Sequence, residues 1–305
     1  MPHVLVRRLS FLPLPLICLL VALVPTQASG QIRKTCPGGV ILKVSAGVSA
    51  QGSLLLTEVR GAKTPTSISS EWDGRSNPLW RENENSATLH GLLGVDLEKP
   101  PGRYEWKVTW PGPEGDAVSC SVFITVRAGK FPTERLTVEQ QFVQPDPEQL
   151  KHAEEDQKKM RAIYNTVTPQ RLWDGKFRLP LQDVITGGNF GRRRILNGEA
   201  RSPHAGVDFP APAGTPVLAS QAGKVVLAEE LYYSGNTVVL DHGFGIYTLY
   251  AHLSEIGVQT GEMVKAGAEI GKVGATGRVT GPHLHWGLTI EHARVNGMQI
   301  AQRQP

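Results

Sequence analysis

The sequence predicts a mainly β protein with an N-terminal immunoglobulin-like β-sandwich, a linker that carries one helix, and a C-terminal β domain. Short apolar runs, two of them with clear period-two alternation, occur on both sides of a single stretch with helical periodicity. Glycine and proline account for 33 and 22 of the 305 residues, an excess that favours a turn-rich fold. Hydrophobic residues make up 40% and charged residues 20%, so the chain can bury a core and is not disordered.

The first thirty residues have the pattern of a secretory signal peptide, residues 1–30. A basic start that includes Arg8 precedes an apolar run over residues 11–24, and small residues suitable for cleavage follow. The alternative is a membrane anchor, but Pro13 and Pro15 interrupt the run, which falls short of the roughly 20 apolar residues that a spanning helix needs. We therefore expect an exported protein of the periplasm, cell envelope or extracellular space, with no transmembrane segment after cleavage.

Cysteine usage and net charge both depend on this signal peptide. Cys18 leaves with it, so the mature protein keeps Cys36 and Cys120, and an exported pair predicts one disulfide. A loop of about 85 residues makes that disulfide worth roughly 4 kcal/mol in the chain-entropy model. Removal of Arg7 and Arg8 also halves the formal charge of +4. The remaining charge is no indication of nucleic-acid binding.

Residues 31–130 predict the small immunoglobulin-like sandwich. Apolar and polar side chains alternate over Arg103–Trp110 and Ala117–Val126, and turns rich in proline and glycine separate the runs. The alternation directs Cys120 and the tryptophans of the first run toward the core. A tryptophan platform for a ligand is the less favoured alternative.

Residues 131–178 predict a linker with one amphipathic helix. Asp146 is a suitable N-cap, Pro147 suits the first helical position, and Gln149 stands three residues after the cap. Apolar residues then recur at helical spacing among charged ones, namely Leu150, Ala153, Met160, Ile163, Tyr164 and Val167. We expect this helix to dock on one of the two domains. Contact with an envelope protein partner, through the helix or the N-terminal domain, is the alternative.

Residues 179–305 return to short β-like runs with many glycines and contain most of the histidines. His204 and Asp208 stand four residues apart, the spacing of neighbours on a helix. The nearby Pro203 and Gly206 instead favour a loop that enters a strand.

His283 and His285 lie at the start of a predicted strand over residues 284–290. If that strand begins one residue earlier, both imidazoles project from the same face, with Cα atoms roughly 6.6–6.8 Å apart. One histidine could then bind a metal while the other reaches a molecule bound to it, or both could be ligands.

Neutral imidazoles and a carboxylate are the donor set that suits Zn²⁺. Two histidines and one aspartate would leave one tetrahedral position open for water, as in catalytic zinc sites. Peptide hydrolysis also needs a group that takes and returns protons, and no HExxH segment supplies a glutamate. A histidine can act instead, and His252 and His283 are the candidates.

Three segments together resemble the signature of the lysostaphin/LytM-type zinc metallopeptidases. They are His204-x-x-x-Asp208, Ala251-His252-Leu253, and the run from Gly274 to Trp286 that contains His283-Leu284-His285. The resemblance covers about residues 185–291. It implies a lysostaphin-like antiparallel β domain with a zinc groove above the sheet.

The resemblance also implies a role for each of these residues. His204, Asp208 and His285 would bind one zinc ion per chain, and His252 and His283 would flank the zinc-bound water. The implied activity is that of an exported zinc-dependent endopeptidase that cuts the peptide cross-links of bacterial peptidoglycan. The alternatives are a non-catalytic cell-wall-binding or amidase-activating LytM-like module, and a metallopeptidase that acts on proteins outside the cell.

Three other features of this half are interpreted from the residues alone. His242 follows Asp241 at a predicted turn, and a structural role is expected for it. The three arginines 192–194 are expected to form a solvated turn, with a contact to anionic wall polymer or substrate carboxylates as the alternative. Tyr247 and Tyr250 are considered for stabilising an oxyanion.

Overall fold

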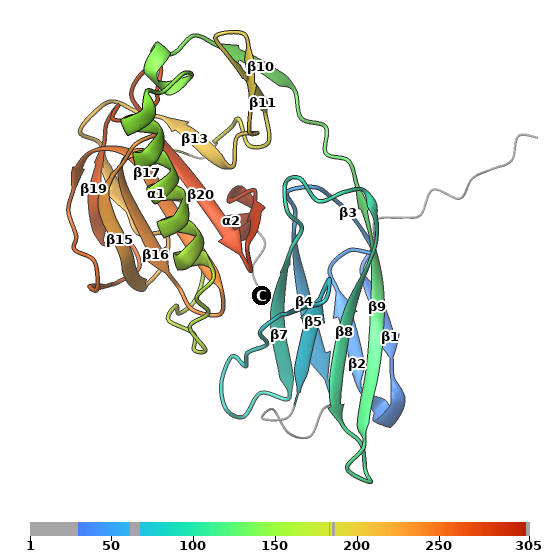
Figure 1. The fold of residues 1–305 in the computed structure, drawn as a ribbon. Helices are drawn as coiled ribbons and strands as arrows, with labels where there is room; N and C mark the ends of the chain where they lie inside the picture. The colour runs from blue at the N-terminus through green and yellow to red at the C-terminus, as the bar shows by residue number, and fades with distance from the viewer. Residues whose placement is uncertain (1–29, 62–67, 183, 185–186, 303–305) are drawn as a thin grey trace, which may run out of the picture.

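The structure is a computed structural model that describes residues 30–61, 68–182, 184 and 187–302 (Figure 1). The predicted signal peptide lies outside the described residues, apart from Gly30. Within the described ranges, no helix is long and apolar enough to cross a membrane. The chain forms an N-terminal β-sandwich, a connecting segment with one long helix, and a larger C-terminal sheet, so the predicted mainly β class is confirmed.

The N-terminal sandwich consists of two sheets that enclose one apolar core. Their strand orders are β1-β2-β4-β7 and β3-β9-β8-β5-β6. The strands are β1 Ile32–Thr35, β2 Ile41–Val44, β3 Val48–Ala50, β4 Leu54–Arg60, β5 Ser69–Trp72, β6 Arg75–Ser76, β7 Thr88–Gly94, β8 Gly102–Pro111 and β9 Ala117–Arg127, and a short 3-10 turn spans Pro37–Gly39. The immunoglobulin-like arrangement of these strands stays a prediction.

The alternation predicted for β8 and β9 is confirmed. Trp106 and Val108 on β8 and Val122 and Ile124 on β9 all belong to the same buried cluster, with Trp106 paired opposite Val122. The tryptophans therefore pack in the core and form no ligand platform.

A disulfide connects the two sheets of the sandwich. Cys36 lies between β1 and β2 of one sheet, and Cys120 lies on β9 of the other, with 6.1 Å between their Cα atoms. The two cysteines are 84 positions apart in the sequence. The predicted pairing is confirmed, and it closes most of the sandwich into one covalent loop.

The C-terminal sheet has nine strands, and all its pairings are antiparallel, as the family resemblance implies. The main path runs β13-β20-β17-β16-β15-β18, while β19 pairs with β14 and β17, and β21 pairs with β20. The strands are β13 Gly206–Pro210, β14 Pro216–Leu218, β15 Gly223–Leu231, β16 Gly235–Asp241, β17 Ile246–Ile256, β18 Met263–Val264, β19 Glu269–Val273, β20 His283–Ile290 and β21 Ala293–Val295, followed by the short helix α2 Met298–Gln302.

Helix α1, Pro147–Tyr164, begins where the sequence predicts. The Asp146 carboxylate accepts from the backbone N–H of Gln149 at 2.8 Å, and the Gln149 side chain accepts from the Asp146 N–H at 3.0 Å. This is a complete capping box. The helix docks on the C-terminal sheet through Met160, Ile163 and Tyr164, which pack against residues of β15, β16 and β17. The predicted apolar face is too wide, because Leu150 and Val167 are exposed.

A small third sheet joins the connecting segment to the C-terminal half. Its strands are β10 Thr133–Leu136, β11 Arg193–Leu196 and β12 Glu199–Arg201. Strand β10 runs parallel to β11, with Glu134 opposite Arg194 and Leu136 opposite Leu196. The connecting segment, which also contains the 3-10 turn Gln140–Phe142, is therefore more than a tether for α1.

The N-terminal sandwich is packed directly against the C-terminal half. The Arg294 guanidinium donates to both carboxylate oxygens of Asp96, at 2.7 and 3.0 Å. Burial raises the pKa of Asp96, but its hydrogen bonds with Arg294 outweigh this and leave the pKa below the usual range. Trp80 of the sandwich also stacks on Phe244. The predicted division at residues 130 and 178 is kept as a proposal.

Candidate metal centre and groove

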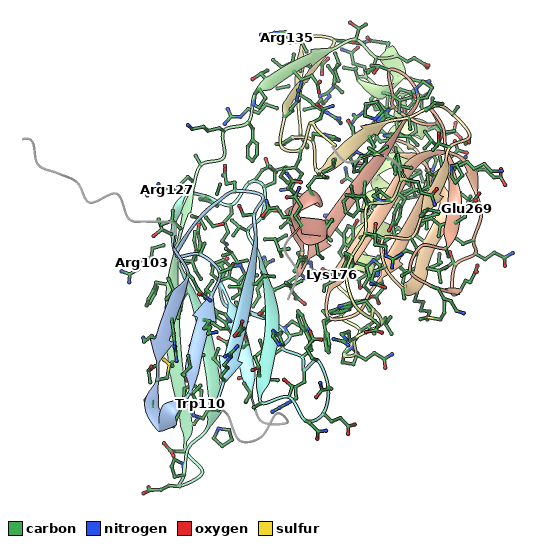
Figure 2. The ribbon with its side chains drawn as sticks, turned by 180° about the vertical axis from the view of Figure 1, so that it is seen from behind. Arg103, Trp110, Arg127, Arg135, Lys176 and Glu269 are labelled. Atoms are coloured by element: carbon green, nitrogen blue, oxygen red, sulfur yellow. A yellow bond between two sulfur atoms is a disulfide. The ribbon has the colours of Figure 1, made fainter. Side chains whose placement is uncertain are left out.

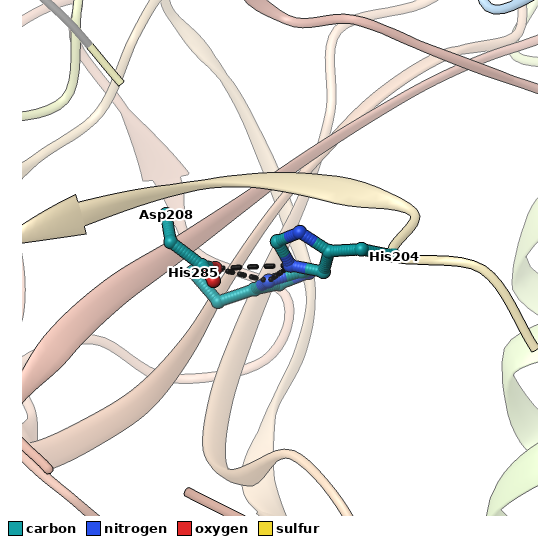
Figure 3. A group of neighbouring side chains, drawn as sticks. All are labelled: His204, Asp208 and His285. Carbon is teal, nitrogen blue, oxygen red and sulfur yellow. Dashed lines mark hydrogen bonds and ion pairs between the residues drawn. The ribbon is translucent and has the colours of Figure 1, made fainter. Parts of the chain in front are cut away.

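Three side chains meet at one end of strands β13 and β20. His204 Nε2 lies 3.0 Å from Asp208 Oδ1, and His285 Nδ1 lies 2.9 Å from the same oxygen. The two imidazole nitrogens are 2.8 Å apart. Figure 3 shows the three side chains pointing toward a common centre, and their ligand atoms all lie within 4.8 Å of one another.

Strand register brings these residues together. Asp208 on β13 is paired with His285 on the antiparallel strand β20, so the two side chains leave the sheet on the same face. His204 lies two residues before β13, in the loop that the sequence predicts. Its backbone is fixed at both ends, because its N–H donates to Arg192 and its carbonyl accepts from Gly191.

The hydrogen bonds around the centre suit a metal ion. His204 Nδ1 lies 2.9 Å from the backbone carbonyl of Asn189, which can only accept, so Nδ1 carries the proton and the lone pair is on Nε2. Burial raises the pKa of Asp208, but the imidazoles of His204 and His285 outweigh it and hold the pKa well below the usual range. Two imidazole nitrogens and an ionised carboxylate are a donor set that fits Zn²⁺.

Gly206 leaves room for the ring of His285. A Cβ on residue 206 would lie 2.5 Å from His285 Nε2, closer than any side chain could tolerate. The ring of His285 therefore packs directly on the backbone of Gly206, with its Nδ1 toward Asp208.

His252 and His283 stand beside this cluster, with ring centroids 4.9 Å apart. His283 is the first residue of β20, so it shares a face with His285, as expected for a strand that begins one residue early. Its Nε2 lies 3.7 Å from Asp208 Oδ1. His252 comes from β17 and adopts a left-handed backbone conformation, with φ of 64°, at an irregularity in the strand pairing. Such conformations are costly for residues other than glycine and are often found at functional sites.

The tautomers of the two flanking histidines follow from their contacts. Nδ1 of His252 lies 2.9 Å from the carbonyl of Thr276, and Nδ1 of His283 lies 2.8 Å from the carbonyl of Gly281. Each Nδ1 therefore carries a proton, and each Nε2 keeps a free lone pair. Burial, and next the neighbouring His285 and His283, lower the pKa of His252, so this ring is neutral near pH 7.

A groove of about 310 Å³ opens above Asp208, His252 and His283. Its opposite wall is formed by one face of the small sheet, through residues of β10 and β11 and the segment that follows β10. The remaining wall is the loop between β19 and β20 with Asn189 and Pro210. The lining residues beyond the histidines and Asp208 are Glu134, Leu136, Val138, Asn189, Arg194, Leu196, Pro210 and 278–282.

The expectation of a solvated turn for the arginines 192–194 is wrong for Arg194. Residues Arg193–Leu196 form strand β11, and the side chain of Arg194 is only 21% exposed, with Nη2 3.7 Å from Asp208 Oδ2. Strand alternation turns Arg194 toward the groove together with Leu196. Four residues with two arginines at their start carry no apolar alternation, so this strand is defined by its pairing with β10, sixty residues earlier, and with β12.

The remaining interpreted residues lie away from the groove. His242 is fully buried and bonds through Nδ1 to the Ala222 carbonyl and through Nε2 to the Thr248 hydroxyl, as expected for a structural role. The Tyr247 hydroxyl donates to the carbonyl of Thr166 beneath α1, and the Tyr250 hydroxyl is buried against Ser220. Neither tyrosine can reach an oxyanion at the centre.

Comparison with known proteins agrees with this geometry. The sequence model of peptidase family M23 matches residues 202–297. The peptidoglycan DD-endopeptidase ShyA of Vibrio cholerae serotype O1 is 44% identical over 127 residues, which are 41% of this chain and 28% of that protein. The DD-carboxypeptidase/endopeptidase Mpg of Neisseria meningitidis serogroup B is 44% identical over 102 residues, 33% of this chain and 24% of that protein. The chain thus spans less than a third of either relative.

A solved structure is similar over nearly the whole chain. It is described as a putative peptidase M23 from Pseudomonas aeruginosa, with 28% sequence identity and a TM-score of 0.56. The match covers 88% of this chain and 96% of that one, so it includes the N-terminal half. The match over residues 202–297, in which all five candidate site residues fall, shows that this part of the chain is a peptidase M23 domain, in agreement with the resemblance to the lysostaphin/LytM-type metallopeptidases.

Proposed function

We propose that this protein is an exported zinc-dependent endopeptidase that hydrolyses peptide bonds in the cross-links of bacterial peptidoglycan. The observation that carries the proposal is the convergence of His204, Asp208 and His285 beside two histidines whose Nε2 atoms are free. The names of ShyA and Mpg support the substrate class, since both are endopeptidases and ShyA is named for peptidoglycan.

His204, Asp208 and His285 would hold the zinc through Nε2, the carboxylate and Nδ1. A zinc ion bound there supplies a Lewis acid that polarises the peptide carbonyl and makes water acidic enough to ionise near pH 7. The Asn189 carbonyl orients the ring of His204, and Gly206 leaves space for the ring of His285. These contacts hold the ligands before substrate arrives.

His252 and His283 would move the protons of the reaction at their Nε2 atoms. A neutral imidazole with Nδ1 anchored on a backbone carbonyl can accept a proton from the attacking water and return it to the leaving amine. Both rings border the groove, and His283 is also within 3.7 Å of Asp208.

Export is supported by the disulfide between the sandwich sheets, because such bonds persist in oxidising compartments. The periplasm or cell envelope is also where a peptidoglycan substrate is found. The envelope protein partner considered for α1 would have to use a surface other than the side already packed on the C-terminal sheet.

The test is digestion of purified sacculi and cross-linked muropeptides by the mature protein with one equivalent of zinc. We expect new amine and carboxyl termini at the cross-link, identified by product masses, and no cleavage after chelation. A zinc-loaded protein that binds sacculi and cuts no bond would instead support the non-catalytic cell-wall-binding or amidase-activating alternative.

A further inference from the structure

Two arginines border the groove beside the candidate catalytic histidines, and the proposed chemistry uses neither. Arg194 comes from β11 on one wall, and Arg278 comes from the loop between β19 and β20 on the other. Both are partly buried, and burial lowers the pKa of each guanidinium below its usual value. A cation placed in such surroundings is stabilised by an anion.

Arg194 has only part of its hydrogen-bonding capacity satisfied. Its Nη2 is 3.7 Å from Asp208, too far for a good hydrogen bond, and its Nε is buried with no partner among the described residues. Glu134, the groove carboxylate opposite it on β10, is engaged by Arg192 at 3.2 Å. When Asp208 binds a metal, its charge is shared with that ion, and Arg194 is left with still less compensation.

Arg278 has no ion pair within the described part of the chain. Its guanidinium lies over the ring of Tyr233, 4.5 Å from the centroid. The ring covers one face of the planar guanidinium, and the N–H groups at its edge remain available to donate hydrogen bonds. After burial, the largest effect that lowers the pKa of Arg278 is the positive charge of Arg194, and both arginines line the same groove. Unlike Arg194, this residue has no contact with the metal ligands to explain its position.

We propose that Arg194 and Arg278 form a carboxylate-binding subsite that selects peptides with a free carboxylate close to the scissile bond. This inference rests on the proposed function, because it places a substrate peptide in the groove. A guanidinium fork binds a carboxylate through two parallel hydrogen bonds, which makes it specific as well as strong. Stem peptides of peptidoglycan carry free carboxylates beside the cross-link, so the subsite would distinguish them from amidated or uncharged peptides.

The test compares two cross-linked tetrapeptide dimers, one with free carboxylates and one with every carboxylate converted to a primary amide. For binding, versions with an N-methylated scissile amide are titrated calorimetrically into the zinc-loaded protein. We expect the wild type to bind the free acid roughly 10- to 100-fold more tightly than the amide. Arg278→Gln should lose this preference, and Arg278→Lys should recover part of it, because the charge returns without the fork.

Arg135→Gln is the matched control. Arg135 lies on the same small sheet, but strand alternation turns it away from the groove to the outside of the molecule, as Figure 2 shows. Its binding preference should equal that of the wild type. Zinc content should be unchanged in all three variants, which separates the subsite from the metal centre.

Equal binding of both peptides by the wild type, or an undiminished preference in Arg278→Gln, would overturn the subsite. Loss of zinc from Arg278→Gln would also overturn it, because the residue would then act through the metal centre. Cleavage of the unmethylated peptides is scored separately. Preferential binding without cleavage supports the subsite and refutes only the proposed endopeptidase activity, whereas cleavage without preference refutes only the subsite.

Discussion

Gly206 lies directly against the ring of His285, where a Cβ would stand 2.5 Å from Nε2. Gly206→Ala should therefore displace His285 and weaken zinc binding by roughly 10-fold or more, a typical effect of losing the support of a metal ligand. Competition with a chromophoric chelator measures the change. Gly188 is the control, since it pairs with Asp208 and a Cβ there would meet nothing within 4 Å. Equal zinc affinity of Gly206→Ala and Gly188→Ala would contradict this account of His285.

His285 and His252 should separate metal binding from proton transfer. We expect His285→Ala to lose both zinc and activity, because one of three ligands is gone. His252→Ala should keep about one zinc per chain and lose roughly 100-fold or more in kcat, because only the proton carrier is removed. Metal analysis and muropeptide cleavage give both values. If His252→Ala also loses its zinc, the assigned role is wrong.

The buried His242 should make stability depend on pH. Burial lowers its pKa to about 4, and the hydrogen bond to Ala222 offsets this only in part. Above pH 6.5, the pKa of a histidine in the unfolded chain, His242 is neutral in both states and does not lower the free energy of unfolding. As the pH falls from 6.5 toward 4, only the unfolded chain takes up a proton, and the free energy of unfolding falls by roughly 3 kcal/mol. Urea unfolding of metal-free protein at several pH values measures this. In His242→Gln the loss of stability over the same range should be smaller by about that amount.

The disulfide between Cys36 and Cys120 should contribute about 4 kcal/mol to the free energy of unfolding of the sandwich. Replacing both cysteines by serine should lower the denaturation midpoint and leave zinc binding intact, because the bond lies in the N-terminal sandwich. Non-reducing mass spectrometry of the mature protein should show the two peptides joined. Free thiols at both positions would remove the support that this bond gives to export.

The sequence predicted those helices and strands whose pattern is contained within their own residues. The alternation around Trp106 and Ile124 defines β8 and β9, and the capping box at Asp146 defines the start of α1. The same-face relation of His283 and His285 needed only the strand period. In each case, the residues that determine the structure are neighbours in the sequence.

The missed features depend on contacts between distant segments. Strand β10 has too few residues for a periodic signal, and its pairing with β11 joins residues sixty positions apart, such as Glu134 and Arg194. No local rule directs Arg194 into the groove. Its position follows from the packing of the small sheet over the centre, which is a property of the folded chain.

The position of the small sheet matters for any attempt to express the M23 domain without the rest of the chain. Family M23 is matched over residues 202–297, yet β10, β11 and β12 all precede that range. A fragment that begins at residue 202 would retain every candidate zinc ligand. It would lose one wall of the groove, including Arg194 and Leu136. If the proposed subsite is right, such a fragment would keep the candidate metal ligands, expose one side of the groove, and bind peptides with a preference different from that of the full chain.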